Sequence, residues 1–243
     1  MLGTGIIGWL RRLVGMPAYV EPSYFYIESR RDKLGSIWRE RWAGTEPYVE
    51  FRPDDEVLDI GCAEGMVSIE LARSVRRVHG IEVIAHRIDM ARKFIKEAGV
   101  TNLTVEVASI ETVPLAPLSY DVVVMAGVYG MELPSGRLIG APELRKVLGA
   151  ARRQLVLRLN VQDDPKAEQS LPEIFDVCDQ MGFDIAAFPK FDRYENLLVA
   201  FRRGAGARMK ATPQLMLMPT GKMSGHPVIN GAPAAPWRFG RPN

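Results

Sequence analysis

The run of residues 57–65 constrains the fold of this chain more than any other feature. Val57–Ile60 is a short apolar segment, and the turn Gly61–Gly65 joins it to residues whose apolar side chains recur at helical spacing. Glycine at both ends of a turn indicates that the backbone passes close to another group. A buried strand that enters a helix through such a turn is typical of an α/β sheet.

Apolar runs and helical spacing alternate from this point to about Arg203. The further strand-like runs are residues 78–81, 103–107, 121–125, 155–159, 185–188 and 197–201. The run at 121–125 is almost wholly apolar, as expected for a strand buried on both faces of a parallel sheet. Residues 188–196 are too few for a crossover helix, so the last run should pair antiparallel with the one before it. We therefore predict a doubly wound α/β fold with a mostly parallel seven-stranded sheet and an antiparallel last strand.

Composition divides the chain into three parts. Residues 1–45 hold three of the four tryptophans and predict an N-terminal helical cap, with contact to a membrane surface as the alternative for the first residues. Residues 46–203 form the predicted α/β domain. Residues 204–243 are rich in proline and glycine and carry five basic but no acidic residues, which predicts a flexible basic tail. The alternative for the tail is contact with RNA or an acidic surface.

Charge and cysteine content narrow the function classes. A net charge of +2 is too balanced for a chain that coats itself in nucleic acid. The two cysteines are far apart, so neither a disulfide framework nor a metal site is expected. No apolar stretch approaches the roughly 18–20 residues that span a bilayer. We therefore expect a soluble cytoplasmic protein, peripheral at a membrane surface if its N-terminus binds one.

Acidic residues at the predicted strand ends indicate the kind of ligand. Glu82 ends the second strand, where its carboxylate is placed to accept both hydroxyl hydrogens of a ribose. Asp59 and Glu64 would repel a pyrophosphate but suit a ligand that carries a sulfonium and an ammonium group. Ala63 and Met66 stand where a dinucleotide-binding Gly-x-Gly-x-x-Gly motif needs glycine. A nicotinamide-dependent oxidoreductase is therefore the less favoured alternative.

At these residues the sequence resembles the class I S-adenosylmethionine-dependent methyltransferase family, over about residues 50–203. Asp59–Gly65 is similar to the family's Asp-x-Gly-Cys-Gly-x-Gly signature, with Ala63 in place of the middle glycine. Gly80–Val83 resembles its acidic ribose-binding strand. Ala108–Glu111 resembles its adenine-contact turn, where the family more often has aspartate at the position of Ser109. Tyr120–Val128 is similar to the fourth-strand motif along the methionine moiety.

The resemblance implies a Rossmann-like methyltransferase fold with S-adenosylmethionine as the cofactor and no metal. It also implies a set of cofactor-binding residues: Asp59, Gly61, Cys62, Ala63, Gly65, Glu82, Val83, Ser109, Ile110, Met125 and Ala126. Of these, Cys62 is expected to fill the loop rather than act as a thiolate. Asp121, at the start of the fourth strand, is expected to be a structural carboxylate that bonds the backbone near strand one.

Methyl transfer is an in-line displacement on an already activated sulfonium, so few catalytic residues are needed. Candidates for a base lie in the loops after strands four and five, namely Tyr129, Glu132 and Asn160. No Asn/Asp-Pro-Pro-Tyr/Phe motif follows strand four, which argues against amino-methylation of DNA. We predict O- or N-methylation of a small-molecule, lipid or glycan acceptor. The alternatives are a catalytically inactive binding or scaffold protein and an RNA methyltransferase that uses the basic tail; the oligomeric state stays open.

Overall fold

The structure is a computed structural model. It describes residue 45, residues 48–160, 170–188 and 195–206, and two short strands at 228–229 and 232–233. The chain divides into two compact units, Met1–Glu40 and Arg41–Asn243. The predicted cap thus lies outside the described residues, apart from Thr45, and so does most of the predicted tail. Both stay predictions.

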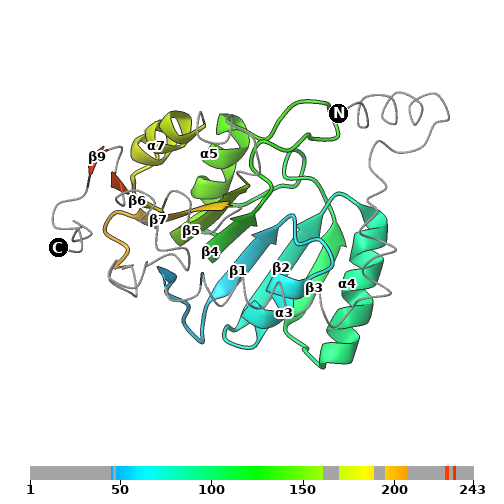
Figure 1. The fold of residues 1–243 in the computed structure, drawn as a ribbon. Helices are drawn as coiled ribbons and strands as arrows, with labels where there is room; N and C mark the ends of the chain where they lie inside the picture. The colour runs from blue at the N-terminus through cyan, green and yellow to red at the C-terminus, as the bar shows by residue number, and fades with distance from the viewer. Residues whose placement is uncertain are drawn as a thin grey trace, which may run out of the picture. The chain divides into compact units, whose positions relative to one another are not determined.

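The second unit is built on one central sheet (Figure 1). Its main strands are β1 (Glu56–Ile60), β2 (Arg77–Glu82), β3 (Leu103–Val107), β4 (Tyr120–Ala126), β5 (Ala151–Asn160), β6 (Phe183–Phe188) and β7 (Glu195–Arg202). The helices within the described residues are α3 (Met66–Ala72), α4 (Ala85–Ala98), α5 (Ala141–Ala150) and α7 (Leu171–Gln180). In that part of the chain no helix is long and apolar enough to cross a membrane.

The strand order of these seven strands is β3-β2-β1-β4-β5-β7-β6. Strands β1 to β5 pair in parallel, whereas β7 pairs antiparallel with both β5 and β6. The predicted doubly wound sheet and its antiparallel last strand are therefore confirmed. Because the chain winds outward from β1 in both directions, the winding reverses between β1 and β4, where ligands bind in open α/β sheets.

Two short strands extend the sheet past β6. Backbone pairs join β6 to β8 (Val228–Ile229), and β8 in turn to β9 (Ala232–Pro233). These four residues fall within the predicted tail at 204–243, whose flexibility stays a prediction. The backbone of β8 pairs with backbone groups at the edge of β6, and the β-branched residues Val228 and Ile229 favour the extended conformation that this needs.

Strand β5 begins four residues earlier than predicted, directly after α5. The sequence did not indicate this start, because the charges of Arg152 and Arg153 interrupt the apolar pattern. In the structure Arg152 donates to Asp121, and Arg153 donates to Asp55. Asp121 also accepts a hydrogen bond of 2.9 Å from the backbone of Glu56 in β1, which confirms its predicted structural role.

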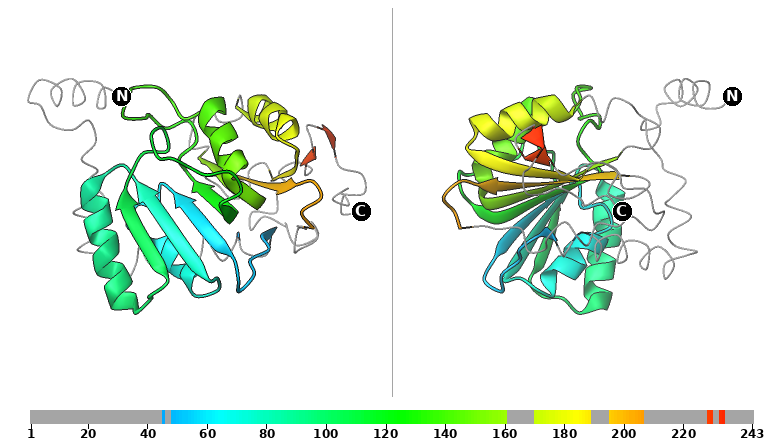
Figure 2. Two further views of the ribbon diagram at one scale, coloured as in Figure 1. Left: turned by 180° about the vertical axis from the view of Figure 1, so that it is seen from behind. Right: turned by 60° about the vertical axis from the view of Figure 1, so that its left-hand side comes forward.

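Helices cover both faces of the sheet (Figure 2). On one face α5 and α7 pack on a core that includes buried residues of β1, β4 and β5: Leu58, Ile60, Val123, Met125, Leu155 and Leu157. On the other face lie α3 and α4, where Ser68 of α3 reaches Asp59. The connection from β3 to β4, residues 108–119, contains no helix. The loop after β3 therefore lies beside α5 with no intervening element.

A buried ion pair ties the entry of β1 to β5. Arg153 donates to both carboxylate oxygens of Asp55 at 2.5 and 2.6 Å, and both side chains are less than a tenth exposed. Burial raises the pKa of Asp55, although the backbone of Arg52 and the guanidinium of Arg153 oppose it. The attraction between the two charges therefore roughly offsets the cost of burying them. Removing one partner leaves the other charge buried without a counter-ion, which destabilises the fold.

We predict that Asp55→Asn lowers the free energy of unfolding by about 3 kcal/mol, because the Arg153 charge stays buried without its counter-ion. Urea unfolding followed by circular dichroism measures this. Asp54→Asn changes the exposed neighbouring residue and should leave the midpoint nearly unchanged. Equal midpoints for the two variants would contradict the importance of the pair.

Candidate active site

The loop after β1 folds back onto the end of β2. The amides of Gly61 and Cys62 both donate to the carbonyl oxygen of Ile81, at 2.8 and 3.0 Å. Gly61 has a φ of 72°, and a Cβ atom there would lie 2.2 Å from Cγ1 of Val128, which follows β4. Glycine is therefore required at this position both by the backbone and by the close approach of Val128.

Ala63 is held in the left-handed region, with a φ of 49°. This conformation is strained for a side chain with a Cβ atom, by about 1–2 kcal/mol, which explains why the signature it resembles has glycine there. The amide of Ala63 donates to Oε2 of Glu82 at 3.2 Å. Gly65, at a φ of 79°, is the N-cap residue of α3.

Glu82 is the residue that joins the loop after β1 to the loop after β2. Its side chain is buried, and its Oε1 accepts a hydrogen bond of 3.0 Å from the amide of Ile84 while Oε2 accepts from Ala63. Each carboxylate oxygen has two lone pairs, so each keeps one acceptor position for a ligand. A pair of ligand hydroxyls matches that remaining capacity.

Asp59 lies at the end of β1, nearly inaccessible to solvent. The Ser68 hydroxyl donates to its Oδ2 at 2.5 Å. Burial raises the pKa of Asp59 to about 6, and the charge of Glu82 adds to this while the Ser68 hydrogen bond opposes it. The two carboxylates therefore repel each other, and a cation nearby would relieve that repulsion.

Glu64 forms an ion pair with Arg87. Its carboxylate lies 3.6 Å from Nε of Arg87 in the first turn of α4. The expectation that Glu64 helps to attract a cationic ligand is therefore weakened, because an ion pair already offsets its charge. The negative character of the site rests on Asp59 and Glu82.

Cys62 packs against β2 and is not a nucleophile. Burial, together with Asp59 and Glu82, raises the pKa of its thiol far above its ordinary range. A Cβ atom at Gly80 would lie 2.9 Å from Sγ of Cys62, so the glycine makes room for the side chain. Sequence reasoning did not single out Gly80 for this role, although a glycine inside an apolar strand is a signal of close approach.

The turn after β3, residues 108–113, lies beside the end of β2. The amide of Ala108 donates to the carbonyl oxygen of Glu82 at 3.0 Å. The hydroxyl of Ser109 accepts a hydrogen bond of 3.2 Å from the amide of Glu111. Val83 and Val107, at the ends of β2 and β3, are nearly half exposed and offer apolar surface. Such a combination of polar turn and apolar surface suits a planar base.

The predicted residues of β4 differ in accessibility. Met125 is fully buried in the core under α5, so its side chain is not available to a ligand. Ala126 is half-buried at the strand end, and Gly127 follows with its amide bonded to the carbonyl oxygen of Arg158 at 2.8 Å. The position in the strand explains the difference, because Val124, on the same face as Ala126, is also fully buried, whereas Ala126 stands at the strand end.

The β4–α5 loop, residues 127–140, carries two of the candidate bases. The hydroxyl of Tyr129 donates to Glu173 of α7 at 3.4 Å, and burial together with Glu173 raises its pKa. Tyr129 therefore keeps its proton at neutral pH and is poorly suited as a base. Glu132 is exposed and pairs through its backbone with Leu138. Asn160 ends β5, and its side chain lies outside the described residues.

Other titratable groups lie away from this loop cluster. His79 bonds Tyr120 at 2.8 Å and Glu106 at 3.1 Å. His79 and Tyr120 also line a pocket of about 220 Å³ at the amino ends of the strands, opposite the site described above. Within the described ranges no group of three or more His, Cys, Asp or Glu residues could hold a metal ion.

Comparison with known proteins gives a family match and several similar structures. A family described as "Methyltransferase domain" matches residues 51–182. A magnesium protoporphyrin IX methyltransferase from Synechocystis with bound S-adenosylmethionine is 20% identical with a TM-score of 0.50, covering 82% of this chain and 92% of that one. An S-adenosylmethionine-dependent methyltransferase from Aquifex aeolicus is 17% identical with a TM-score of 0.51, covering 63% and 84%.

A further similar structure is phosphoethanolamine N-methyltransferase 2 from Haemonchus contortus in complex with S-adenosylmethionine. It is 12% identical with a TM-score of 0.55, covering 68% of this chain and 52% of that one. At these identities the likeness establishes the fold, which is the one that the sequence resemblance implies.

The raised pKa of Asp59 predicts a pH-dependent stability. The folded protein holds this proton up to about pH 6, whereas the ordinary pKa is 3.8, so folding is favoured below pH 4 and the benefit is lost as pH rises to 6. The loss is on the order of 3 kcal/mol. Asp59→Asn should remove it. Denaturant unfolding of both proteins between pH 4 and 7 measures the difference, and parallel curves would show that Asp59 titrates normally.

Proposed function

Because the chain belongs to the methyltransferase domain family and is an S-adenosylmethionine-dependent methyltransferase, we propose that it methylates a small-molecule, lipid or glycan acceptor on oxygen or nitrogen. Family membership also argues against the nicotinamide-dependent alternative. We further propose that the loops after β1, β2 and β3 hold the cofactor and that the β4–α5 loop faces the acceptor.

The residues around β1 fit this cofactor. Glu82 retains two acceptor positions, which match the two ribose hydroxyls. The buried carboxylate of Asp59 offers the negative charge that a cationic methionine group needs. Val83 and the 108–113 turn provide the apolar and polar sides of a site for adenine. When bound, the cofactor supplies a methyl group already activated by its sulfonium.

The proposed acceptor class rests on the side chains that the β4–α5 loop exposes. Its exposed side chains include Met131 and Leu138, which are 49% and 59% exposed, together with the acidic Glu132. Its single basic residue, Arg137, is engaged with two carboxylates. Proteins that bind nucleic acid present clustered unpaired Lys and Arg to phosphates, which this loop does not. An apolar or uncharged acceptor fits better.

The chain's own contribution to the reaction is positioning and exclusion of water. Leu133 and Ile139 are buried and anchor the β4–α5 loop over the core. A loop fixed in this way holds an acceptor atom in line with the methyl group and limits solvent, which together supply much of the rate. An acceptor that must lose a proton needs a base, and Glu132 remains the exposed carboxylate in the loop for that role.

The acceptor class is tested by incubation with methyl-labelled S-adenosylmethionine and a fractionated cell extract. We expect the label in the small-molecule or lipid fraction. Treatment with ribonuclease should leave the labelled product intact. Label that is lost with ribonuclease would replace the proposal with an RNA acceptor, and no labelled product in any fraction would favour a binding protein without turnover.

We predict that Glu82→Gln weakens the binding of S-adenosylmethionine by about 1.5–3 kcal/mol, because an uncharged amide replaces a carboxylate that accepts the ribose hydroxyls. Isothermal titration calorimetry measures the change. Asp89→Asn, on the exposed face of α4, is the matched control and should bind normally. Unchanged affinity in Glu82→Gln would place the ribose elsewhere.

A further inference from the structure

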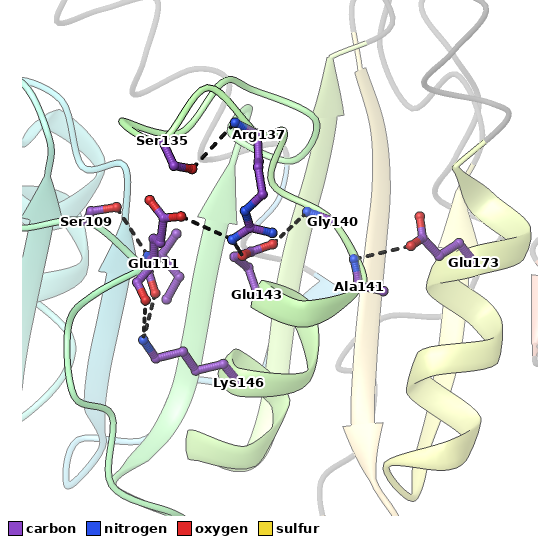
Figure 3. A network of polar contacts seen from close by, with 10 residues as sticks. Ser109, Glu111, Ser135, Arg137, Gly140, Ala141, Glu143, Lys146 and Glu173 are labelled. Carbon is purple, nitrogen blue, oxygen red and sulfur yellow. Dashed lines mark hydrogen bonds and ion pairs between the residues drawn. The ribbon is translucent and has the colours of Figure 1, made fainter.

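A polar network links the 108–113 turn, the β4–α5 loop and α5 (Figure 3). We propose that Lys146 and Arg137 are positioning residues that connect the cofactor side of the site to its acceptor side. Lys146 fixes the turn that meets the adenine, and Arg137 ties the β4–α5 loop to that turn, so that cofactor binding orders the acceptor loop. This inference rests on the proposed locations of the cofactor and the acceptor.

Lys146, on α5, hydrogen-bonds the backbone of the 108–113 turn. Its ammonium group donates to the carbonyl oxygens of Ile110 and Glu111, at 2.8 and 3.3 Å, across more than 30 residues of sequence. The contact is possible because the connection from β3 to β4 contains no helix, so α5 lies directly beside the turn. Two successive carbonyls held by one cation fix the orientation of the peptide planes between them.

The ammonium group of Lys146 is partly buried where it meets the turn. Burial lowers the pKa of its ammonium group, while the nearby carboxylate of Glu143 opposes the shift. A partly buried ammonium group is retained where hydrogen bonds replace its lost hydration. The carbonyls of the turn provide that replacement, so the turn and Lys146 stabilise each other.

Arg137 connects this turn to the β4–α5 loop. Its Nη2 donates to Oε1 of Glu111 at 3.1 Å and to Oε1 of Glu143 at 3.0 Å. The two carboxylates raise the pKa of Arg137, and hydrogen bonding by Ser135 and Arg137 lowers the pKa of Glu111. One guanidinium of the loop is therefore shared between the turn and α5.

Glu143 and Glu173 fix the end of the loop where α5 begins. Burial alone would raise the pKa of Glu143, but the backbone amides of Gly140 and Glu143 and the guanidinium of Arg137 lower it overall. Its Oε2 accepts a hydrogen bond of 3.1 Å from Gly140. Glu173 of α7 accepts one of 3.2 Å from the amide of Ala141. These two hydrogen bonds hold the C-terminal end of the loop, as Figure 3 shows.

The tip of the loop is also held by backbone hydrogen bonds within the loop and by Ser135, which hydrogen-bonds Glu111. Between residues 130 and 138 only Leu133 is buried, and the remaining side chains are exposed. Arg137 joins the tip to α5 through Glu143, and it shares the contact to Glu111 in the turn with Ser135. Binding energies at two sites that share such an element are coupled, and the coupling is reciprocal. A ligand that rigidifies the 108–113 turn should slow the opening of the loop tip.

The test uses S-adenosylhomocysteine, whose binding needs no acceptor. In the wild type, hydrogen exchange should slow on saturation in both the 108–113 turn and residues 130–139. In Arg137→Gln the turn should still be protected, while the slowing in residues 130–139 falls by about fivefold or more. Arg137 is half exposed, so this variant leaves the core intact. Equal protection of residues 130–139 in variant and wild type would overturn the connection.

The role of Lys146 is tested by affinity. Lys146→Met should raise the Kd for S-adenosylhomocysteine about tenfold, since an ammonium group with two hydrogen bonds is lost. Lys146→Arg keeps the charge and N–H donors and should bind more tightly than Lys146→Met. An arginine variant as weak as the methionine variant would assign the effect to packing and overturn the proposal. Lys93→Met, exposed on α4, is the matched control and should bind normally.

The outcomes separate the two proposals. Failure of the wild type to bind S-adenosylhomocysteine, or protection that bypasses the 108–113 turn, would overturn the proposed cofactor site and the inference with it. Normal binding by every variant, with unchanged exchange, would overturn the inference alone.

Discussion

The hydrogen bonds that Glu82 accepts from the amides of Ala63 and Ile84 are the constraint on which the site depends. They join the loops after two neighbouring strands through one buried carboxylate. Asp59 lies close enough for its pKa to respond to this charge, so the two strand tips form one electrostatic unit. The parallel pairing of β1 and β2, residue by residue, brings these groups to the same edge of the sheet.

Much of the fold was predictable because its central strands, β1 and β4, are buried on both faces. Continuous apolar runs mark such strands regardless of what surrounds them, and the short link before β7 determined its antiparallel direction. The start of β5 was not predictable in this way. From the sequence, Arg152 and Arg153 are expected at the surface. Their partners, Asp121 and Asp55, are far away in the sequence, so only the structure reveals the pairing.

The site was predictable where one motif contains the chemistry and less so where distant segments meet. The glycines and acidic residues of the first two loops form a local pattern that the fold places together. The pairing of Glu64 with Arg87 and the burial of Met125 depend on packing that spacing does not reveal. Lys146 carried no signal at all, because a lysine on an amphipathic helix is ordinarily solvated and its partners are backbone atoms of another loop.

The backbone conformation at Ala63 limits which residues can occupy this position. Glycine adopts its left-handed conformation freely, asparagine and aspartate do so with modest strain, and β-branched residues are nearly excluded. Because the amide at this position is bonded to Glu82, the loop cannot escape the strain by changing shape without releasing the carboxylate. We therefore expect glycine, asparagine or aspartate to be tolerated at this position and β-branched residues to disturb the loop.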